Sequence, residues 1–201
     1  MKRQQKTYMK AFNKIFSGLD ISKARVEIES NAHLFGELSA RKEIGPVMAQ
    51  MDDIWLRYGD ISEMLKTGDY SGIAKEHDSI WLKDLPECKK LCFKVMSLVD
   101  GERLGGVLIT KLPIGAEMLP HTDKGWHAEY YDKYYVPIEN EAGSIFGFDE
   151  GDINPELGDV WAFDNSYMHW VKNNSKSERI AMIICIKQNK YTKGGLLCLG
   201  E

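Results

Sequence analysis

One segment near the middle of the chain carries a clear helical pattern. Between residues 85 and 99 apolar residues recur at steps of three and four, and Asp100 and Gly101 then end the run. The apolar positions are Leu85, Cys88, Leu91, Cys92, Val95, Met96 and Val99. This spacing predicts an amphipathic helix that places Cys88 and Cys92 on one face, where burial explains them better than metal binding does.

The chain before this helix shows weaker patterns. Residues 2–14 combine basic side chains with Tyr8, Met9 and Phe12, which predicts a short amphipathic helix packed on its own domain rather than an arm for a partner. Residues 20–85 mix short extended runs with turn sequences and contain no motif of defined chemistry. Four residues of this half are candidates for setting substrate choice: Trp55, Arg57, His77 and Trp81.

After residue 104 the pattern changes to short apolar or alternating runs separated by Gly, Pro, Asn and Asp. The predicted strands cover residues 106–112, 130–138, 143–148, 159–163 and 179–186. Their length and spacing predict an α+β, mainly β fold, a double-stranded β-helix (a jelly-roll or cupin-like barrel) with N-terminal helices packed outside. We expect a single domain over residues 1–201, with a helical and mixed region at 1–103 and the barrel core at 104–190.

Composition and charge narrow the class of protein. With 43% apolar and 28% charged residues among 201, the chain is an ordinary globular protein, neither disordered nor fibrous. A net charge of −4 argues against a dedicated nucleic-acid binder. We expect no membrane span, because no run approaches the roughly 20 apolar residues required. The four cysteines match no zinc pattern, and without a secretory signal they predict reduced thiols in a cytoplasmic protein.

Three residues of the second half are candidate metal ligands. His121 and Asp123 lie two apart, so in an extended strand both side chains project to the same face. His169 follows a polar turn and begins an apolar run, a position at which a strand can present a side chain at the barrel mouth. Two histidines and one carboxylate form the facial triad of non-haem Fe(II) oxygenases, which leaves positions open for a cosubstrate and O2. The pattern therefore predicts an iron site.

Arg179 begins the last apolar strand, ten residues after His169. A guanidinium inside an apolar segment needs an anionic partner, because an unpaired buried charge is strongly unfavourable. Its planar fork suits a carboxylate, and a dicarboxylate could chelate iron at one end and meet Arg179 at the other. The alternative is a surface ion pair with Glu178 or Asp164.

The proposed ligands also have ordinary explanations. His121 alone suits a loop, His169 could simply pack beside Trp170, and the Asp123–Gly125 run is a good turn sequence. The order and spacing of the residues together favour the iron site. Asn165 and Ser166 are interpreted as a turn that supports His169.

An aromatic segment lies between Asp123 and His169 of the predicted triad. His127 competes as a metal ligand, but in a barrel we expect it to line the entrance instead. The candidate wall of the substrate site comprises Trp126, His127, Tyr130, Tyr131 and Trp161.

Several of these residues belong to longer motifs. The motifs are Leu108–Thr110, His121–Asp123, Lys133–Ile138, Gly158–Ser166, His169 and Arg179. Over about residues 104–187 the chain resembles the aspartyl/asparaginyl β-hydroxylase branch of the Fe(II)/2-oxoglutarate-dependent oxygenases. The resemblance implies the barrel fold, Fe(II), and 2-oxoglutarate with its remote carboxylate on Arg179.

The same resemblance extends to two further contacts with the cosubstrate. Thr110 stands where the family places a hydroxyl that touches 2-oxoglutarate, and Lys133 stands where the family usually has an arginine for that purpose. The lysine is a departure from the family pattern. Some members lack the carboxylate ligand, whereas this chain keeps Asp123.

We therefore expect a dioxygenase that uses Fe(II), 2-oxoglutarate and O2 to hydroxylate an unactivated carbon. Its substrate could be an Asp- or Asn-type protein side chain, an amino acid or another small molecule, with a nucleobase less favoured. One alternative is a metal-dependent cupin enzyme without 2-oxoglutarate, although such sites have no reason for an inward arginine. Another is a non-catalytic β-barrel module that binds a peptide or sugar through residues 126–135.

Overall fold

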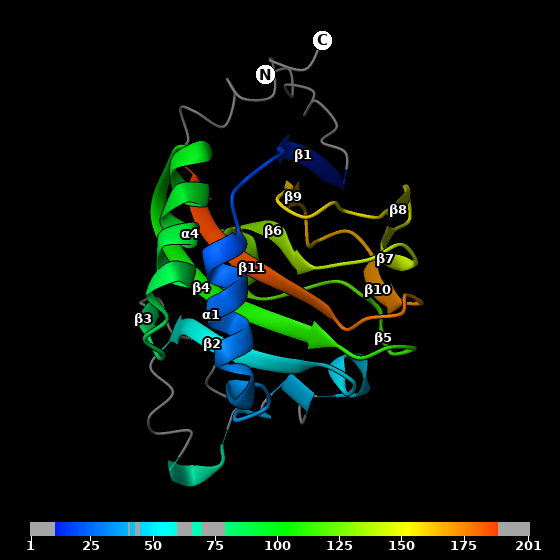
Figure 1. The fold of residues 1–201 in the computed structure, drawn as a ribbon, viewed down its shortest axis with the longest axis horizontal. Helices are drawn as coiled ribbons and strands as arrows, with labels where there is room; N and C mark the ends of the chain where they lie inside the picture. The colour runs from blue at the N-terminus through cyan, green and yellow to red at the C-terminus, as the bar shows by residue number, and fades with distance from the viewer. Residues whose placement is uncertain (1–10, 40, 43–44, 60–65, 70–78, 189–201) are drawn as a thin grey trace, which may run out of the picture.

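Two antiparallel β-sheets face each other, and helices cover the outer face of the larger sheet (Figure 1). The computed structural model describes residues 11–39, 41–42, 45–59, 66–69 and 79–188. The larger sheet has the order β1-β9-β6-β11-β4-β2-β3 and the smaller sheet has the order β5-β10-β7-β8. This double-stranded β-helix with outer helices confirms the predicted fold class.

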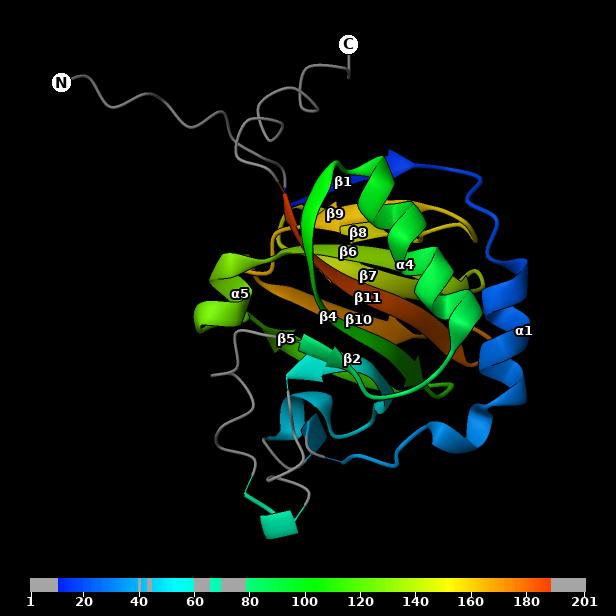
Figure 2. The same ribbon diagram turned by 90° about the vertical axis from the view of Figure 1, so that its left-hand side faces the viewer.

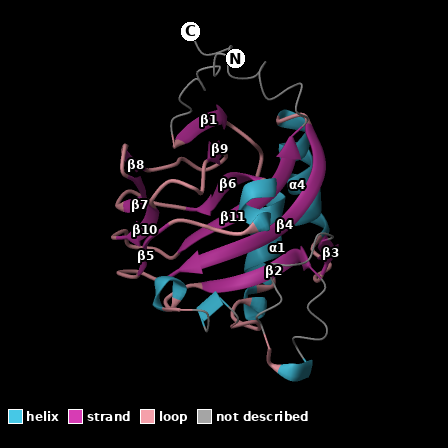
Figure 3. Cartoon of the chain, turned by 180° about the vertical axis from the view of Figure 1, so that it is seen from behind, coloured by secondary structure: helices cyan, strands magenta, loops and turns pink. Residues whose placement is uncertain are grey.

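The strands of the larger sheet come from both halves of the chain. They are β1 (Phe12–Phe16), β2 (Asp52–Gly59), β3 (Ser79–Trp81), β4 (Gly101–Leu112), β6 (Asp132–Glu139), β9 (Val160–Phe163) and β11 (Arg179–Gln188). The smaller sheet comprises β5 (Glu117–His121), β7 (Ser144–Phe148), β8 (Gly151–Ile153) and β10 (His169–Asn173). Figure 3 shows the smaller sheet on the side of the molecule away from the two long helices.

Helices α1 (Ser22–Ser30) and α4 (Pro86–Leu98) pack on the outer face of the larger sheet (Figure 2). Leu91 and Val95 of α4 are buried against the even-numbered apolar residues of β11, Met182, Ile184 and Ile186. Moving each such side chain out of water contributes roughly 1.5–3 kcal/mol to the stability of the fold. The Glu27 carboxylate of α1 also accepts hydrogen bonds from the backbone N–H groups of Glu87 and Cys88, which begin α4. The predicted helix over 85–99, with Cys88 and Cys92 buried, is confirmed.

The inner faces of the two sheets form a second core. Alternate residues of β11 point there, because successive side chains of a strand lie on opposite faces. Ala181 and Ile183 meet Phe146 and Phe148 from β7 of the opposite sheet. The remaining elements lie at the ends of this sandwich: η1 (Ala32–Leu34), η2 (Pro46–Met48) and α5 (Trp126–Tyr130).

The N-terminal prediction needs correction. Residues 2–10 of the helix expected over residues 2–14 lie outside the described residues, but Phe12–Phe16 form strand β1, paired with β9. Phe12 packs on Phe148 and Trp161, and Lys14 forms an ion pair with the buried Asp159 at 2.8 Å. These tertiary contacts override the helical pattern. Since β1, β2 and β3 all join the larger sheet, that sheet extends beyond the segment 104–190.

Candidate metal centre

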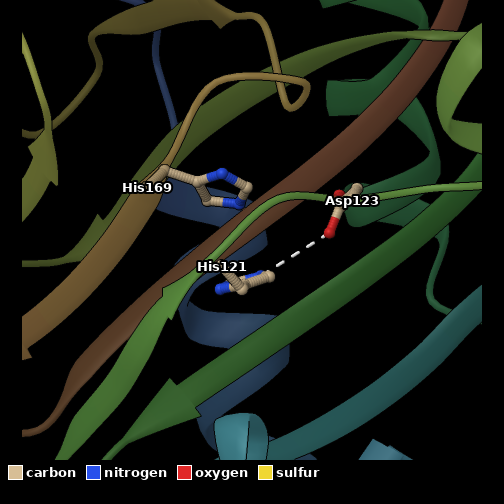
Figure 4. Close-up of side chains that lie close together, drawn as sticks. All are labelled: His121, Asp123 and His169. Atoms are coloured by element: carbon tan, nitrogen blue, oxygen red, sulfur yellow. Dashed lines mark ion pairs between the residues drawn. The ribbon is translucent and has the colours of Figure 1, made fainter.

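Two histidines meet where β5 ends and β10 begins. The strands are antiparallel neighbours, and His121 and His169 are direct partners in the register. Directly opposed side chains of a strand pair lie on the same face, within about 5 Å at Cβ. The two imidazole centroids are accordingly 4.3 Å apart (Figure 4).

Backbone carbonyl groups fix the orientation of both imidazole rings. Nδ1 of His121 lies 2.9 Å from the carbonyl oxygen of Leu119, and Nδ1 of His169 lies 2.9 Å from that of Tyr167. A carbonyl oxygen can only accept, so each Nδ1 carries the proton and each Nε2 keeps its lone pair. His121 Nε2 is buried without a hydrogen-bond partner among the described residues. Both nitrogens are therefore prepared to bind a cation.

Asp123 completes the group from a loop and not from the strand, which corrects the sequence prediction that it shares a strand with His121. Strand β5 ends at His121. The backbone N–H of Asp123 donates to the carbonyl oxygen of Asn165 at 2.9 Å, and the Asn165 amide donates to Asp123 Oδ2 at 3.0 Å. These two bonds leave Oδ1 facing His121 Nε2 at 3.5 Å (Figure 4).

The carboxylate of Asp123 is held in its ionised form. Burial by itself raises the pKa of this group, but the close approach of His121, the positive charge of Lys133 and the hydrogen bond from Asn165 together lower it. For His169, burial lowers the pKa and so favours the neutral imidazole that a metal requires.

One potential ligand atom from each of His121, Asp123 and His169 lies within 4.8 Å of the others. These three residues fit a divalent cation. They supply oriented imidazole lone pairs, a buried nitrogen without a hydrogen-bond partner among the described residues, and an ionised carboxylate. Two imidazoles and one carboxylate match the facial triad of Fe(II) oxygenases.

The triad opens into a cavity of about 620 Å³ between the two sheets. Arg179 lines this cavity and is only 2% exposed. Its guanidinium lies over the ring of Tyr135, 5.0 Å from the centroid, and its Nε has no hydrogen-bond partner among the described residues. The alternative partners are engaged elsewhere, since Glu178 lies 3.6 Å from Lys111 and Asp164 accepts from Ser166. Arg179 is thus a buried cation that faces the cavity.

Thr110 and Lys133 line the same cavity at different ends. Thr110 is buried on β4 opposite Ala181, two residues from Arg179 along β11. Lys133 lies opposite Cys185, six residues from Arg179, and its Nζ is 3.2 Å from Cys185 Sγ. Six residues of strand span about 20 Å. Thr110 is therefore near Arg179, whereas Lys133 is near Asp123 and the far end of the cavity.

Of the five candidate wall residues, His127 lines the cavity. Its ring packs between Tyr58, at 5.3 Å, and Tyr131, at 4.9 Å. Burial lowers the pKa of His127 to about 3, so the imidazole is neutral at physiological pH. As expected, it lies outside the triad.

The other four lie beside the cavity rather than on its wall. Tyr130 and Tyr131 pack against each other at the end of α5, and Trp126 begins that helix. Trp161 packs on Phe12 and donates its Nε1–H to Asp159. Their contact with a substrate stays a prediction.

Residues of the first half complete the wall. Trp55 lines the cavity, as do Tyr58 and Arg41, which the sequence analysis missed. Arg41 forms an ion pair with the buried Asp53 at 3.1 Å. Tyr58 and Arg41 belong to no periodic pattern in the sequence, so no sequence signal indicated that they line a cavity. Of the other candidates, Arg57 and Trp81 stack on each other on β2 and β3 away from this wall, and His77 lies outside the described residues.

The hydrogen bond from Asn165 leads to a prediction about metal affinity. Asn165→Ala removes the donor that orients Asp123, so we expect Mn(II) to bind about 10–100-fold more weakly, with the fold intact. Isothermal titration calorimetry measures this, and Ser166→Ala, at the exposed neighbouring position, is the control. Unchanged affinity in the Asn165 variant would mean that the loop holds Asp123 without this side chain.

Comparison with known proteins agrees with this geometry. The family model for aspartyl/asparaginyl beta-hydroxylase matches residues 48–189. No curated protein sequence matches the chain.

Among solved structures, 369 chains match. A prolyl hydroxylase from Trichoplax adhaerens, in complex with a hypoxia inducible factor peptide fragment, has a TM-score of 0.55 at 11% identity, over 91% of this chain and 86% of its own. A Pseudomonas putida prolyl-4-hydroxylase has a TM-score of 0.54 at 12% identity, over 89% and 93%. HygX from Streptomyces hygroscopicus, with nickel, 2-oxoglutarate and hygromycin B bound, has a TM-score of 0.53 at 12% identity, over 90% and 84%.

At these identities the solved structures show the fold alone. The family model covers more than half of the chain, and the triad fits the iron that such enzymes use. The chain therefore belongs to the aspartyl/asparaginyl β-hydroxylase family of Fe(II)- and 2-oxoglutarate-dependent oxygenases.

Proposed function

We propose that this protein is a dioxygenase that holds Fe(II) with His121, Asp123 and His169 and hydroxylates an unactivated carbon of its substrate. The observation that carries the proposal is the convergence of these three ligand groups on one cavity that also contains the buried cation Arg179. When bound, the iron supplies O2 activation coupled to the decarboxylation of 2-oxoglutarate to succinate and CO2.

Arg179 binds the remote carboxylate of 2-oxoglutarate in this proposal. The buried guanidinium gains the anionic partner that it lacks among the described residues, and its planar fork suits a carboxylate. Thr110 lies two residues away in the register and donates its hydroxyl to the same group. Tyr135 also lines this end of the cavity, with a fully buried hydroxyl that has no hydrogen-bond partner among the described residues.

Lys133 contacts the cosubstrate at its other end. Lys133 lies on the side of the cavity where Asp123 is. Lys133 and Arg179 therefore do not bind the same carboxylate of 2-oxoglutarate. A lysine here keeps the positive charge of the family arginine but gives up the bidentate geometry. Phe146, Val171 and Ile183 line the cavity between the polar groups and exclude water from it. In such surroundings each charged contact is stronger than in water.

In this proposal the substrate lies on the side of the cavity lined by Arg41, Trp55, Tyr58 and His127, away from Arg179. The family suggests an Asp- or Asn-type side chain, and an amino acid or another small molecule would also fit a cavity of this size. Among the structures of similar fold, one is a complex with a peptide fragment and another holds hygromycin B. The inward arginine favours a 2-oxoglutarate oxygenase over a cupin enzyme that does not use this cosubstrate.

We also propose that the enzyme works in the cytoplasm. Cys88, Cys92 and Cys185 are free, buried thiols, as expected of a reducing compartment. Among the described residues, no helix combines the length and the apolar character that crossing a membrane would take.

The proposed function predicts the result of removing the carboxylate ligand. With Fe(II) and 2-oxoglutarate supplied, we expect the wild-type protein to release succinate when screened against pools of peptides, amino acids and nucleotides. Asp123→Ala should abolish substrate-coupled succinate formation, because the ion loses its single anionic ligand. Asp149→Ala, at an exposed position, is the matched control. Undiminished turnover of the Asp123 variant would remove this residue from the site.

Replacement of Arg179 gives effects of opposite sign on binding and on stability. Arg179→Met should weaken 2-oxoglutarate binding to the Mn(II)-loaded protein by at least about 100-fold, since a buried charge pair is lost. The ligand-free variant should be as stable as the wild type or more stable, because an unpaired buried charge is removed.

Calorimetry and urea unfolding measure the two effects of the Arg179 replacement, and Arg25→Met, at a surface ion pair, is the control. A variant that retains 2-oxoglutarate affinity would exclude Arg179 as the anchor.

A further inference from the structure

Lys133 and Cys185 form a close amine–thiol pair on the wall of the cavity. They are direct partners in the register of β6 and β11, and Lys133 Nζ lies 3.2 Å from Cys185 Sγ. Both residues line the cavity that contains the triad. Among the described residues, the thiol sulfur is the one hydrogen-bond acceptor of this ammonium group. Because sulfur is a weak acceptor, Lys133 has no strong hydrogen-bond partner in the described part of the chain.

The two strands hold the nitrogen and the sulfur together. On either side of the pair, Ile184 lies opposite Tyr134 and Ile186 lies opposite Asp132 in the same register. Tyr134, Ile184 and Ile186 are 2% exposed or less and pack in the core on the α4 side of the larger sheet. Strands anchored in this way cannot separate, so the amine and the thiol meet at a high effective concentration.

The other cysteines that the structure describes cannot take the place of Lys133. Cys88 and Cys92 lie on α4, on the outer face of the larger sheet, whereas Cys185 lines the cavity on the inner side. Burial raises the pKa of Cys92 to about 12, so this thiol stays protonated and reacts slowly with oxidants. Among the described residues, the Lys133 amine is therefore the group beside Cys185 that can react with an oxidised sulfur.

The cavity also gives an oxidant access to the pair. Enclosed cavities with apolar walls take up small apolar molecules, and Phe146, Val171 and Ile183 supply such walls here. In the proposed function O2 reacts at the triad, and Lys133 lies at the end of the cavity where Asp123 is. A thiol that oxidises to a sulfenic acid condenses with a neighbouring thiol or nitrogen. At Cys185 the neighbour is a nitrogen.

We propose that Lys133 and Cys185 form an oxidative modification site, at which O2 joins the two side chains through a covalent Nζ–O–Sγ bridge. The ammonium group first releases a proton to solvent. One oxygen atom of O2 then forms a bond to sulfur and a bond to nitrogen. The S–H bond and one N–H bond break, and both hydrogens leave with the second oxygen atom as water. Sulfur and nitrogen each lose two electrons, and O2 gains all four.

The bridge removes a positive charge from the cavity. A nitrogen bonded to oxygen is a much weaker base than an amine, so the bridged Lys133 is neutral. The inference goes beyond the proposed function, since the bridge needs only the pair and O2. If Lys133 contacts 2-oxoglutarate as proposed, the bridge weakens cosubstrate binding. Two equivalents of a dithiol supply the four electrons that restore the amine and the thiol.

Mass spectrometry of the whole protein tests the bridge. Protein kept in air-saturated buffer should gain one oxygen atom and lose two hydrogens relative to protein kept under argon. O2 enriched in a heavy oxygen isotope should label the added atom. Proteolysis should yield a linked peptide that contains both Lys133 and Cys185, and dithiothreitol should return the original mass and the separate peptides.

Variants identify the two partners. Lys133→Arg, which keeps the positive charge but has a guanidinium in place of the amine, and Cys185→Ala should each abolish the linked species. Lys172→Arg, at an exposed lysine, and Cys92→Ala, at a buried cysteine, should keep it. The bridge would be overturned by air-exposed wild-type protein without the linked peptide, by oxidation of Cys185 to a sulfinic acid alone, or by a mass change that persists in both partner variants.

Binding of 2-oxoglutarate separates this inference from the proposed function. Calorimetry on the reduced, Mn(II)-loaded protein measures cosubstrate binding without the bridge. The bridged protein should bind at least about tenfold more weakly, because a contact with a charged group is lost. Binding by the reduced protein without any linked peptide after air exposure would overturn the bridge alone. A linked peptide in protein that does not bind 2-oxoglutarate when reduced would support the bridge and overturn the proposed cosubstrate.

Discussion

The antiparallel pairing of β5 with β10 is the interaction on which the site depends. It places His121 opposite His169, and the carbonyl groups of Leu119 in β5 and of Tyr167 just before β10 orient both imidazole rings so that their Nε2 atoms face the same site. A shift of one residue in this register would move one imidazole to the other face of the sheet. The loop that carries Asp123 adds the charge, and Asn165 ties that loop to the segment before β10.

Strand β11 links this site to the core of the protein. One face of the strand presents Met182 and Ile184 to helices α1 and α4, and the other presents Arg179 and Cys185 to the cavity. The apolar face anchors the strand, so the guanidinium can be held in the cavity although its Nε has no hydrogen-bond partner among the described residues. The stability of the fold thus offsets the cost of a cationic cavity.

The sequence predicted the parts of the structure that depend on local period or on residue chemistry. The 3.6-residue pattern gave α4, the apolar run gave β11, and the rarity of an inward arginine pointed to Arg179. Strand β1 was missed because its pairing with β9 depends on Phe12 contacts formed across 136 or more residues of chain. Tyr58 lies on β2, which reaches the cavity through its pairing with β4, and Arg41 is held there by its ion pair with Asp53; no short-range pattern reveals either contact.

The most direct test of the central claim is an anaerobic titration of the protein with Fe(II) and 2-oxoglutarate, followed by visible absorption. A keto acid chelated to ferrous iron in a site with open positions gives a metal-to-ligand charge-transfer band. The account predicts that band in the wild-type protein and its loss in His169→Ala. A wild-type protein without the band, or a variant that retains it, would contradict the account.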